Sequence, residues 1–160
     1  MSASDDADLL KTMSMLEEQE RDLVLARFDN DDAWRLGCML VDLARDRALA
    51  VTIDVRRGSQ QLFHAARPGT APDNDSWVER KARVVERFGT SSYRAGLVPM
   101  VDGTTFEARN ELPRQQFTAA GGSFPIRVAG VGIVGAVTVS GLHPADDHAL
   151  VIDALRLFLA

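Results

Sequence analysis

Apolar and polar positions alternate along this chain with two periods, one typical of helices and one typical of strands. Apolar residues recur every three to four positions in three early stretches, which predict helices over residues 9–21, 31–47 and 76–88. Between the last two, apolar Val51, Ile53 and Val55 alternate with polar residues and predict a half-buried strand. A Gly58-Ser59 turn and a return strand over residues 60–66 complete a hairpin.

The second half of the chain is less regular. We expect short helices over residues 92–100 and 113–119, while residues 101–112 are polar and are expected to be exposed. Two more strands are predicted over residues 123–128 and 131–140, joined at Ala129-Gly130. A final helix begins at Pro144, with Asp146 and Asp147 in its first turn.

The predicted order is α-α-β-β-α-loop-β-β-α. Hairpin-linked strands pair antiparallel, and helices must cover the apolar faces of the sheet. The sequence therefore predicts an α/β fold of the α+β type, a three-layer α/β/α sandwich with a central antiparallel sheet. We expect a single domain over residues 9–160, preceded by a disordered acidic tail over residues 1–8.

Local signals indicate where the helices begin and end. The run from Asp29 to Asp32 is a strong helix start, and the helix that follows is expected to bury Trp34 together with Cys38 and its leucines. Ser76, with Glu79 three residues later, forms a capping box that opens the third helix. Gly89 is suited to end it.

One charged residue falls on an apolar helical face. Lys81 lies four residues after Trp77 and three before Val84. Burying an ammonium group is costly unless it is paired. We therefore expect Lys81 to meet a carboxylate, a backbone carbonyl, a partner subunit or an anionic ligand.

Two neighbouring segments could complete a pocket around this lysine. Residues 73–75 either cap the helix or form a polar mouth above a pocket lined by Trp77, and Asn74 lies in that mouth. Gly121 and Gly122 could offer backbone N–H groups to an anion.

Charge and composition exclude several function classes. The net charge is −5 and no basic stripe is interleaved with aromatic residues, which argues against nucleic-acid binding. No apolar run reaches 18 residues, so no membrane partner is expected. The first residues lack the basic start and apolar core of a secretory signal, which favours a cytoplasmic location. The single Cys38 is expected to be buried and unreactive.

The remaining motifs carry little chemistry. The glycines at 130, 132 and 135 match G-x-G-x-x-G, but a strand follows them instead of a helix, so we expect a tight turn and close packing of a helix on the sheet. His64 could be a base, an acid, a ligand or a packed histidine. We expect His148 to pack within the last helix and His143 to be a cap or a surface group. No metal-ligand spacing is present, and no catalytic residue can be assigned.

Several motifs in a fixed order resemble a known family. They are residues 29–37, 51–55, 61–65, 73–77, Lys81 and residues 121–126. Together they resemble the bacterial and fungal family labelled haem-degrading domain-containing protein, within the wider GlcG/HbpS-like group. The resemblance implies a profilin-like domain, assembly into a homo-oligomer and haem as a candidate cofactor. By motif position it carries over a set of ligand-binding candidates: His64, Asn74, Trp77, Lys81, Gly121 and Gly122.

Three functions stay open at this point. The leading hypothesis is a homo-oligomeric domain that binds a small anionic ligand, with haem or a related tetrapyrrole as the first candidate. Lys81 would neutralise the ligand, His64 would ligate it or hydrogen-bond to it, and Trp77 and Phe63 would stack or pack on it. One alternative is a small enzyme acting on a carboxylate substrate, with Lys81 or His64 as the base. The other is a structural or partner-binding module in which Lys81 and the strand edges form a subunit interface.

Overall fold

A computed structural model describes residues 2–160. Within them the chain forms six helices and one five-stranded sheet. The elements in chain order are α1 (Ala3–Asp22), β1 (Val24–Leu25), α2 (Asn30–Asp46), β2 (Thr52–Arg57), β3 (Gln60–Ala66), α3 (Pro72–Phe88), α4 (Ser92–Val101), α5 (Phe106–Asn110), β4 (Ser123–Val128), β5 (Gly132–Ser140) and α6 (Pro144–Leu159). The mixed α/β fold expected from the sequence is confirmed.

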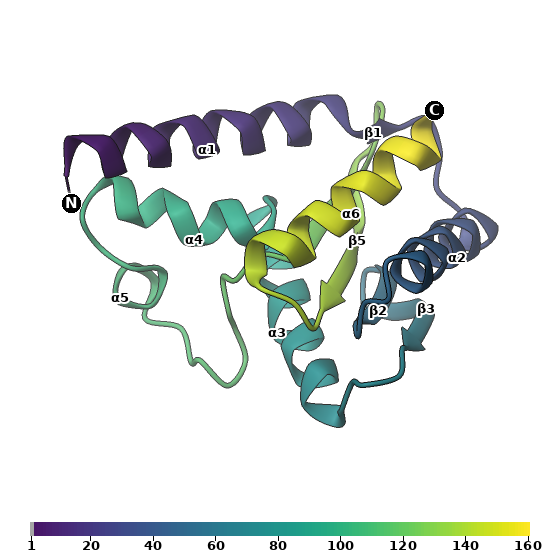
Figure 1. Ribbon diagram of the computed structural model, residues 1–160. Helices are drawn as coiled ribbons and strands as arrows, with labels where there is room; N and C mark the ends of the chain where they lie inside the picture. Colours follow the sequence, from purple (N-terminus) through teal and green to yellow (C-terminus); the bar gives the residue numbers. More distant parts are fainter. Residues whose placement is uncertain (1) are drawn as a thin grey trace.

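The sheet lies between two helical layers, in the strand order β1-β4-β5-β2-β3 (Figure 1). Helices α2 and α6 pack on one side, α3 packs across β5, β4 and β2, and α1 lies along α4 at one end of the molecule. Four strands are antiparallel, as predicted. The short β1 was not predicted, and it pairs with β4 in parallel, so the sheet is not wholly antiparallel.

The two faces of the sheet differ in chemistry. The face beneath α2 and α6 holds the main apolar core, in which Ile53 and Val137 meet the leucines of α2 and the apolar stripe of α6. The opposite face, beneath α3, is polar although buried. It carries Thr52, Asp54, Ser123, Thr138 and Ser140. Because side chains alternate along a strand, the residues that looked solvent-facing in the sequence are covered by α3.

Two helices begin earlier than predicted because side chains cap them. Helix α1 begins at Ala3, where the Ser2 hydroxyl and the Asp5 carboxylate form a capping box, so residues 3–8 of the expected disordered tail are helical. Met1 lies outside the described residues. Helix α3 begins at Pro72 instead of Ser76, because Asn74 Oδ1 accepts a hydrogen bond from the Ala71 N–H.

Three further predictions are wrong in detail. Trp34, expected inside, is 62% exposed and packs edge-on against Phe63, because the adjacent Ala33 and Leu36 are the side chains of α2 that face the sheet. Residues 113–119 form a turn and not a helix. Residues 101–112 are not uniformly exposed, because α5 inserts Phe106 into a small cluster with Val84.

The glycine-rich segment is a turn, as expected, but its closest packing is between strands. Gly130 and Gly132 have positive φ angles at the β4–β5 turn. A Cβ atom at Gly135 would lie 1.8 Å from the backbone oxygen of Arg56 on β2, so this glycine allows two strands, and not a helix and the sheet, to approach.

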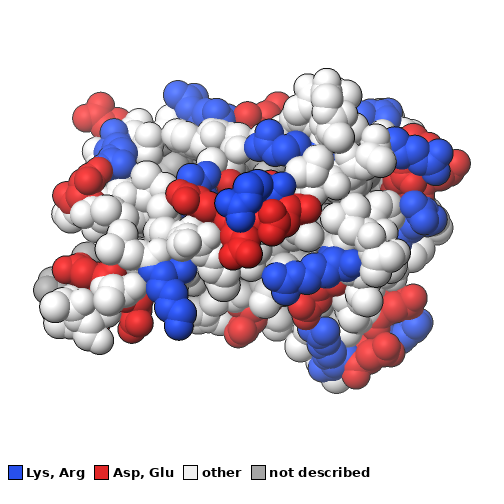
Figure 2. Space-filling view, turned by 90° about the horizontal axis from the view of Figure 1, so that it is seen from above, with Lys and Arg blue, Asp and Glu red and all other residues white. Residues whose placement is uncertain are grey.

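No helix among the described residues has the length and apolar character needed to span a bilayer. The face shown in Figure 2 carries acidic and basic side chains interspersed, without a broad field of one sign. This face offers no extended basic surface of the kind that binds nucleic acid.

Candidate functional site

Lys81 is buried in an ion pair that joins α3 to α6. Its Nζ lies 2.9 Å from Asp147 Oδ2 and 3.2 Å from the backbone oxygen of Val139 on β5, and the residue is 2% exposed. Asp147 Oδ1 in turn accepts a hydrogen bond of 2.9 Å from the Leu142 N–H. Of the four expected kinds of partner, Lys81 thus has two, a carboxylate and a backbone carbonyl.

The same pair faces a cavity of about 270 Å³ between the first half of α3 and the turn that connects β5 to α6. Asn74, Trp77 and Lys81 line one side of it, and Asp147 and the β5–α6 turn line the other. The other lining residues are Ala120, Ser140, Gly141, Leu142 and Pro144. An ammonium group has three N–H donors, and two of those of Lys81 have the partners named above. No third hydrogen bond of Lys81 Nζ is present among residues 2–160.

Burial and mutual attraction act in opposite directions on this pair. Burial lowers the pKa of Lys81 and raises the pKa of Asp147, because each ion loses water on folding. The attraction between the two charges opposes both shifts. The pKa values of Lys81 and Asp147 therefore lie closer together than those of the same two groups in water.

The two candidate glycines lie behind the lysine. Gly122 has φ 131°, and a Cβ atom there would lie 2.7 Å from Lys81 Nζ and 2.4 Å from the backbone oxygen of Val139. A Cβ atom at Gly121 would lie 2.3 Å from the backbone oxygen of Pro144. These glycines make room for the ammonium group and for the start of α6. Neither contributes to the lining of the cavity.

Asn74 and Trp77 have structural partners as well as places in the cavity wall. Asn74 caps α3 through its side-chain oxygen. The Trp77 indole N–H donates to Asp73 at 3.2 Å, and the Arg80 guanidinium stacks 4.2 Å from the Trp77 ring centre. Trp77 is thus fixed in orientation by its own helix.

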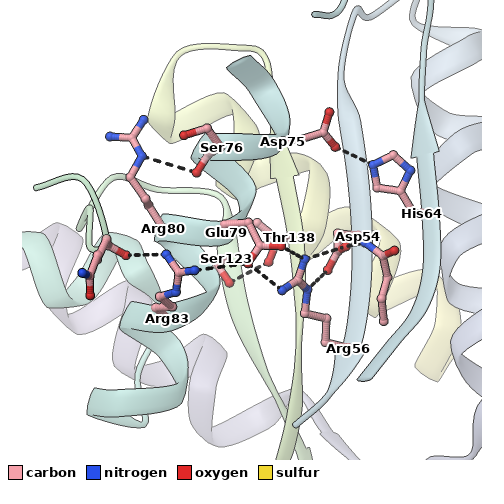
Figure 3. A network of polar contacts seen from close by, with 12 residues as sticks. Asp54, Arg56, His64, Asp75, Ser76, Glu79, Arg80, Arg83, Ser123 and Thr138 are labelled. Carbon is pink, nitrogen blue, oxygen red and sulfur yellow. Dashed lines mark hydrogen bonds and ion pairs between the residues drawn. The ribbon is translucent and has the colours of Figure 1, made fainter. Parts of the chain in front are cut away.

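His64 lies on the other flank of α3. Its Nε2 lies 2.6 Å from Asp75 Oδ1 (Figure 3). Residues 74, 77 and 81 share one face of the helix, whereas Asp75 and Glu79 point roughly 150° away from that face, at about 100° per residue. Within one copy of the chain, the structure therefore separates His64 from the Lys81 cavity.

A second polar network, which the sequence did not suggest, lies on the His64 side. The Arg56 guanidinium bonds Asp54 at 2.6 Å and Glu79 at 2.5 and 2.9 Å (Figure 3). The Gln61 side chain also donates to Asp54. Asp54 is fully buried. Arg56 lowers the pKa of Glu79, and the two carboxylates raise the pKa of Arg56.

A larger cavity, of about 620 Å³, lies beside this network. It runs between the second half of α3, the β2–β3 turn and the start of β5. Arg56, Glu79, Arg83 and Glu86 give its wall charges of both signs. It contains none of the residues expected to bind a ligand.

The remaining histidines and the single cysteine are in structural positions. His148, 3% exposed, bonds Gln19 through Nε2 at 2.7 Å, and burial lowers its pKa to about 4. His143 caps α6 through Nδ1, as expected. Cys38 is partly buried against the core. Over residues 2–160, no three His, Cys, Asp or Glu side chains are grouped to hold a metal ion.

Comparison with known sequences identifies relatives along most of the chain. The family described as "Haem degrading protein HbpS-like" matches residues 28–156. The UPF0303 protein SCO2848 of Streptomyces coelicolor is 59% identical over 148 residues, which are 92% of this chain and 94% of that protein. The family resemblance expected from the motifs is confirmed.

Solved structures share the fold. The crystal structure of the Ybr137w protein superposes with a TM-score of 0.83 at 27% identity, over 91% of this chain and 86% of that one. The crystal structure of the PduOC:Heme complex superposes with a TM-score of 0.64 at 16% identity, over 83% of this chain and 94% of that one. The second similarity is one of fold alone.

Proposed function

This chain belongs to the HbpS-like family of haem-degrading proteins, and on that premise we propose that it is a homo-oligomeric protein that binds a small carboxylate-bearing ligand, haem being the first candidate. The family description and the heme-bound PduOC neighbour favour haem. The acidic side chains of haem are the part of that molecule that a buried lysine would recognise.

One observation carries the proposal. Lys81 is a buried ammonium with one N–H donor still available, and it forms one wall of a cavity that an aromatic ring also lines. A buried charge used only for stability does not need an adjoining cavity, and an apolar pair of the same shape would serve the fold as well. A cavity beside an incompletely bonded charge is typical of a ligand site.

The geometry limits how haem could bind. Sites that enclose a drug-sized ligand measure about 300–1,000 Å³, so the cavity of about 270 Å³ suits an acidic arm of haem better than the whole macrocycle. His64 suits the iron: Asp75 bonds one ring nitrogen, and this arrangement orients a metal-ligating histidine and leaves Nδ1 available. Because the two sites lie on different flanks of α3, His64 and Lys81 of one copy would not hold the same haem.

Assembly into a homo-oligomer has its own support. Large apolar side chains exposed next to one another mark interaction surfaces, and Leu10 and Val101 adjoin in this way at a hollow lined by α1 and α4. Several large apolar side chains are exposed in a single copy. They include Leu10, Met15, Trp34, Val101, Val131 and Leu157.

A haemin titration followed through the Soret band tests the proposal. We expect saturable binding of one haemin per subunit. Affinity should fall at least tenfold in Lys81→Met and stay unchanged in Lys11→Met, which alters the only other lysine of the chain. Asn74→Asp is a second test, because aspartate keeps the helix cap while adding a negative charge at the cavity. It should weaken binding as well.

His64→Ala separates the two sites. If the iron is held by His64, this variant changes the position of the Soret band, and the control His143→Asn, which keeps a capping side chain on α6, does not. Non-saturating haemin uptake, or uptake that is insensitive to both Lys81→Met and Asn74→Asp, contradicts the assignment of the Lys81 cavity.

A further inference from the structure

The Lys81 cavity has no net charge to offer an anion while both members of its ion pair are ionised. One positive charge, on Lys81, is already matched by one negative charge, on Asp147. The other charged or titratable groups that neighbour the pair in sequence, or contact a residue beside it, lie on the helices, and β5 contributes none. They are Asp73 and Arg80 on α3, Tyr93 on α4, and His143, Asp146 and His148 on α6.

A ligand carboxylate would therefore be the second carboxylate for a single ammonium group. Keeping two carboxylates ionised in one buried site is very unfavourable, because their mutual repulsion adds to the loss of water by each. One of them takes a proton. Asp147 is already shifted in that direction, since burial raises its pKa even with Lys81 beside it.

We propose that the Lys81 cavity binds a small monocarboxylate together with one proton, which Asp147 takes up from solvent. This inference rests on the proposed function and specifies how its site works. Before binding, Asp147 Oδ2 pairs with Lys81 Nζ. After binding, the ligand carboxylate pairs with Lys81, and the new O–H group of Asp147 donates a hydrogen bond to the ligand.

The existing contacts of Asp147 are compatible with this exchange. Its Oδ1 still accepts the hydrogen bond from the Leu142 N–H, so the carboxyl group keeps its position when Oδ2 is protonated. The backbone oxygen of Val139 still holds Lys81. No backbone contact has to break. The flat wall formed by Trp77 and the small volume favour a compact, partly apolar acid over a polyanion.

Tryptophan fluorescence can test this directly, because the chain has only two tryptophans. In a Trp34→Phe protein, Trp77 in the cavity wall is the sole reporter. We would titrate it with benzoate between pH 5.5 and 8, with benzamide as an uncharged ligand of the same shape. Calorimetry of benzoate binding in two buffers of different ionisation enthalpy would count the protons taken up.

We expect the Kd of benzoate to rise by a factor approaching ten for each pH unit, the slope that belongs to uptake of one proton. Calorimetry should give one proton per benzoate, and binding of benzamide, if any, should not depend on pH. Asp147→Asn, which resembles the protonated carboxyl, should make benzoate binding independent of pH.

Two negative results have different meanings. Saturable benzoate binding that is constant from pH 5.5 to 8, with no proton uptake, would overturn the proton-coupled binding and leave the carboxylate site standing. Absence of benzoate binding at every pH, together with haemin uptake that Lys81→Met does not weaken, would overturn both the site and the inference.

Discussion

The central residue of this protein is a lysine that is buried at a cost and then paired. Lys81 and Asp147 each lose water on folding, and such a loss amounts to several kcal/mol per ion before attraction offsets it. Removing one partner leaves the other as an uncompensated buried charge. The pattern of the sequence identified Lys81 correctly as an anomaly, because it lies on an apolar stripe. It could not identify Asp147, which is 66 residues away in the sequence. The position of Asp147 in the first turn of α6 was already explained by the favourable effect of an acidic residue there.

Lys81→Met should therefore destabilise the fold by about 3–5 kcal/mol at neutral pH. The loss should depend on pH. Without Lys81, burial keeps the pKa of Asp147 in the folded protein above its value in the unfolded chain, so the folded state binds more protons and loses stability as the pH rises. Urea unfolding at pH 4.5 and pH 8 measures this, and the difference from the wild type should be larger at pH 8.

The double variant Lys81→Met/Asp147→Leu is the control, because it leaves no charge in the site. It should regain much of the lost stability. If it is no more stable than Lys81→Met, the cost does not arise from an unpaired carboxylate.

His148 provides a second dependence on pH. Its pKa falls from 6.5 to about 4 on folding, so the protein is most stable when this histidine is neutral. Stability should decline as the pH falls from 6.5 to 4, by roughly 3 kcal/mol in all from this residue. His148→Gln should flatten the pH dependence of urea unfolding over this range. Parallel curves for the variant and the wild type would contradict this origin.

At the scale of elements, α3 packs on the polar face of the sheet. Three side-chain contacts, each with a carboxylate, hold it there: Asp75 with His64, Glu79 with Arg56 and Lys81 with Asp147. Cavities lie along both of its flanks. Helices α2 and α6, by contrast, are held by an apolar core. Helix α3, which lines the candidate site, is thus held by polar contacts, and the strength of such contacts depends on their geometry.

The Arg56 network should contribute strongly to this anchoring. Arg56→Met removes the guanidinium shared by the fully buried Asp54 and by Glu79, and it should cost about 3–5 kcal/mol. Arg83→Met is a matched control, since Arg83 is exposed and lies 3.8 Å from Glu79, and it should change stability by less than about 1 kcal/mol. Equal losses of stability in the two variants, measured by urea unfolding, would contradict the claim that Arg56 anchors α3.

The order of the long elements could be predicted from the sequence. Where each element ends, and which helix covers which face of the sheet, could not. Alternation located β2, and the glycine-containing turns after it and between the last two strands located β3, β4 and β5. The two residues of β1 have no period to detect. The alternation of β2 predicted a half-buried strand, but it cannot show that α3 covers the polar side. Trp34 is exposed for a related reason, because its helix is amphipathic and a large ring next to the apolar stripe can lie on either side of it.

At the scale of the whole molecule, the sheet divides the protein into a half that stabilises the fold and a half that faces the candidate site. Residues 28–156, which match the family, include both halves. From the sequence, Trp77 and Lys81 could be assigned to one site because they share a helix face, and Asn74 because it lies in the polar segment just before the predicted helix. The position of His64 relative to them depends on the packing of α3 against β3, which no local pattern reveals.

The proposed homo-oligomer requires assembly beyond a single copy. Light scattering after gel filtration should give a mass that is a multiple of 17.5 kDa, the mass of one chain. Trp34→Glu, which places a charge at the most exposed aromatic side chain, should lower that mass if the face around Trp34 is an interface. A mass of 17.5 kDa for the wild type at micromolar concentration would contradict the homo-oligomer.

The most direct test of the central claim is to locate the ligand on the protein. Backbone amide NMR shifts can be followed while benzoate is added at pH 5.5. We predict that the largest changes fall on the residues around the Lys81 cavity, above all Trp77, Gly141 and Leu142, and that they disappear in Lys81→Met. Changes centred instead on the larger cavity beside Arg56 and Arg83, or left intact in Lys81→Met, would contradict the claim that the buried lysine forms the binding site.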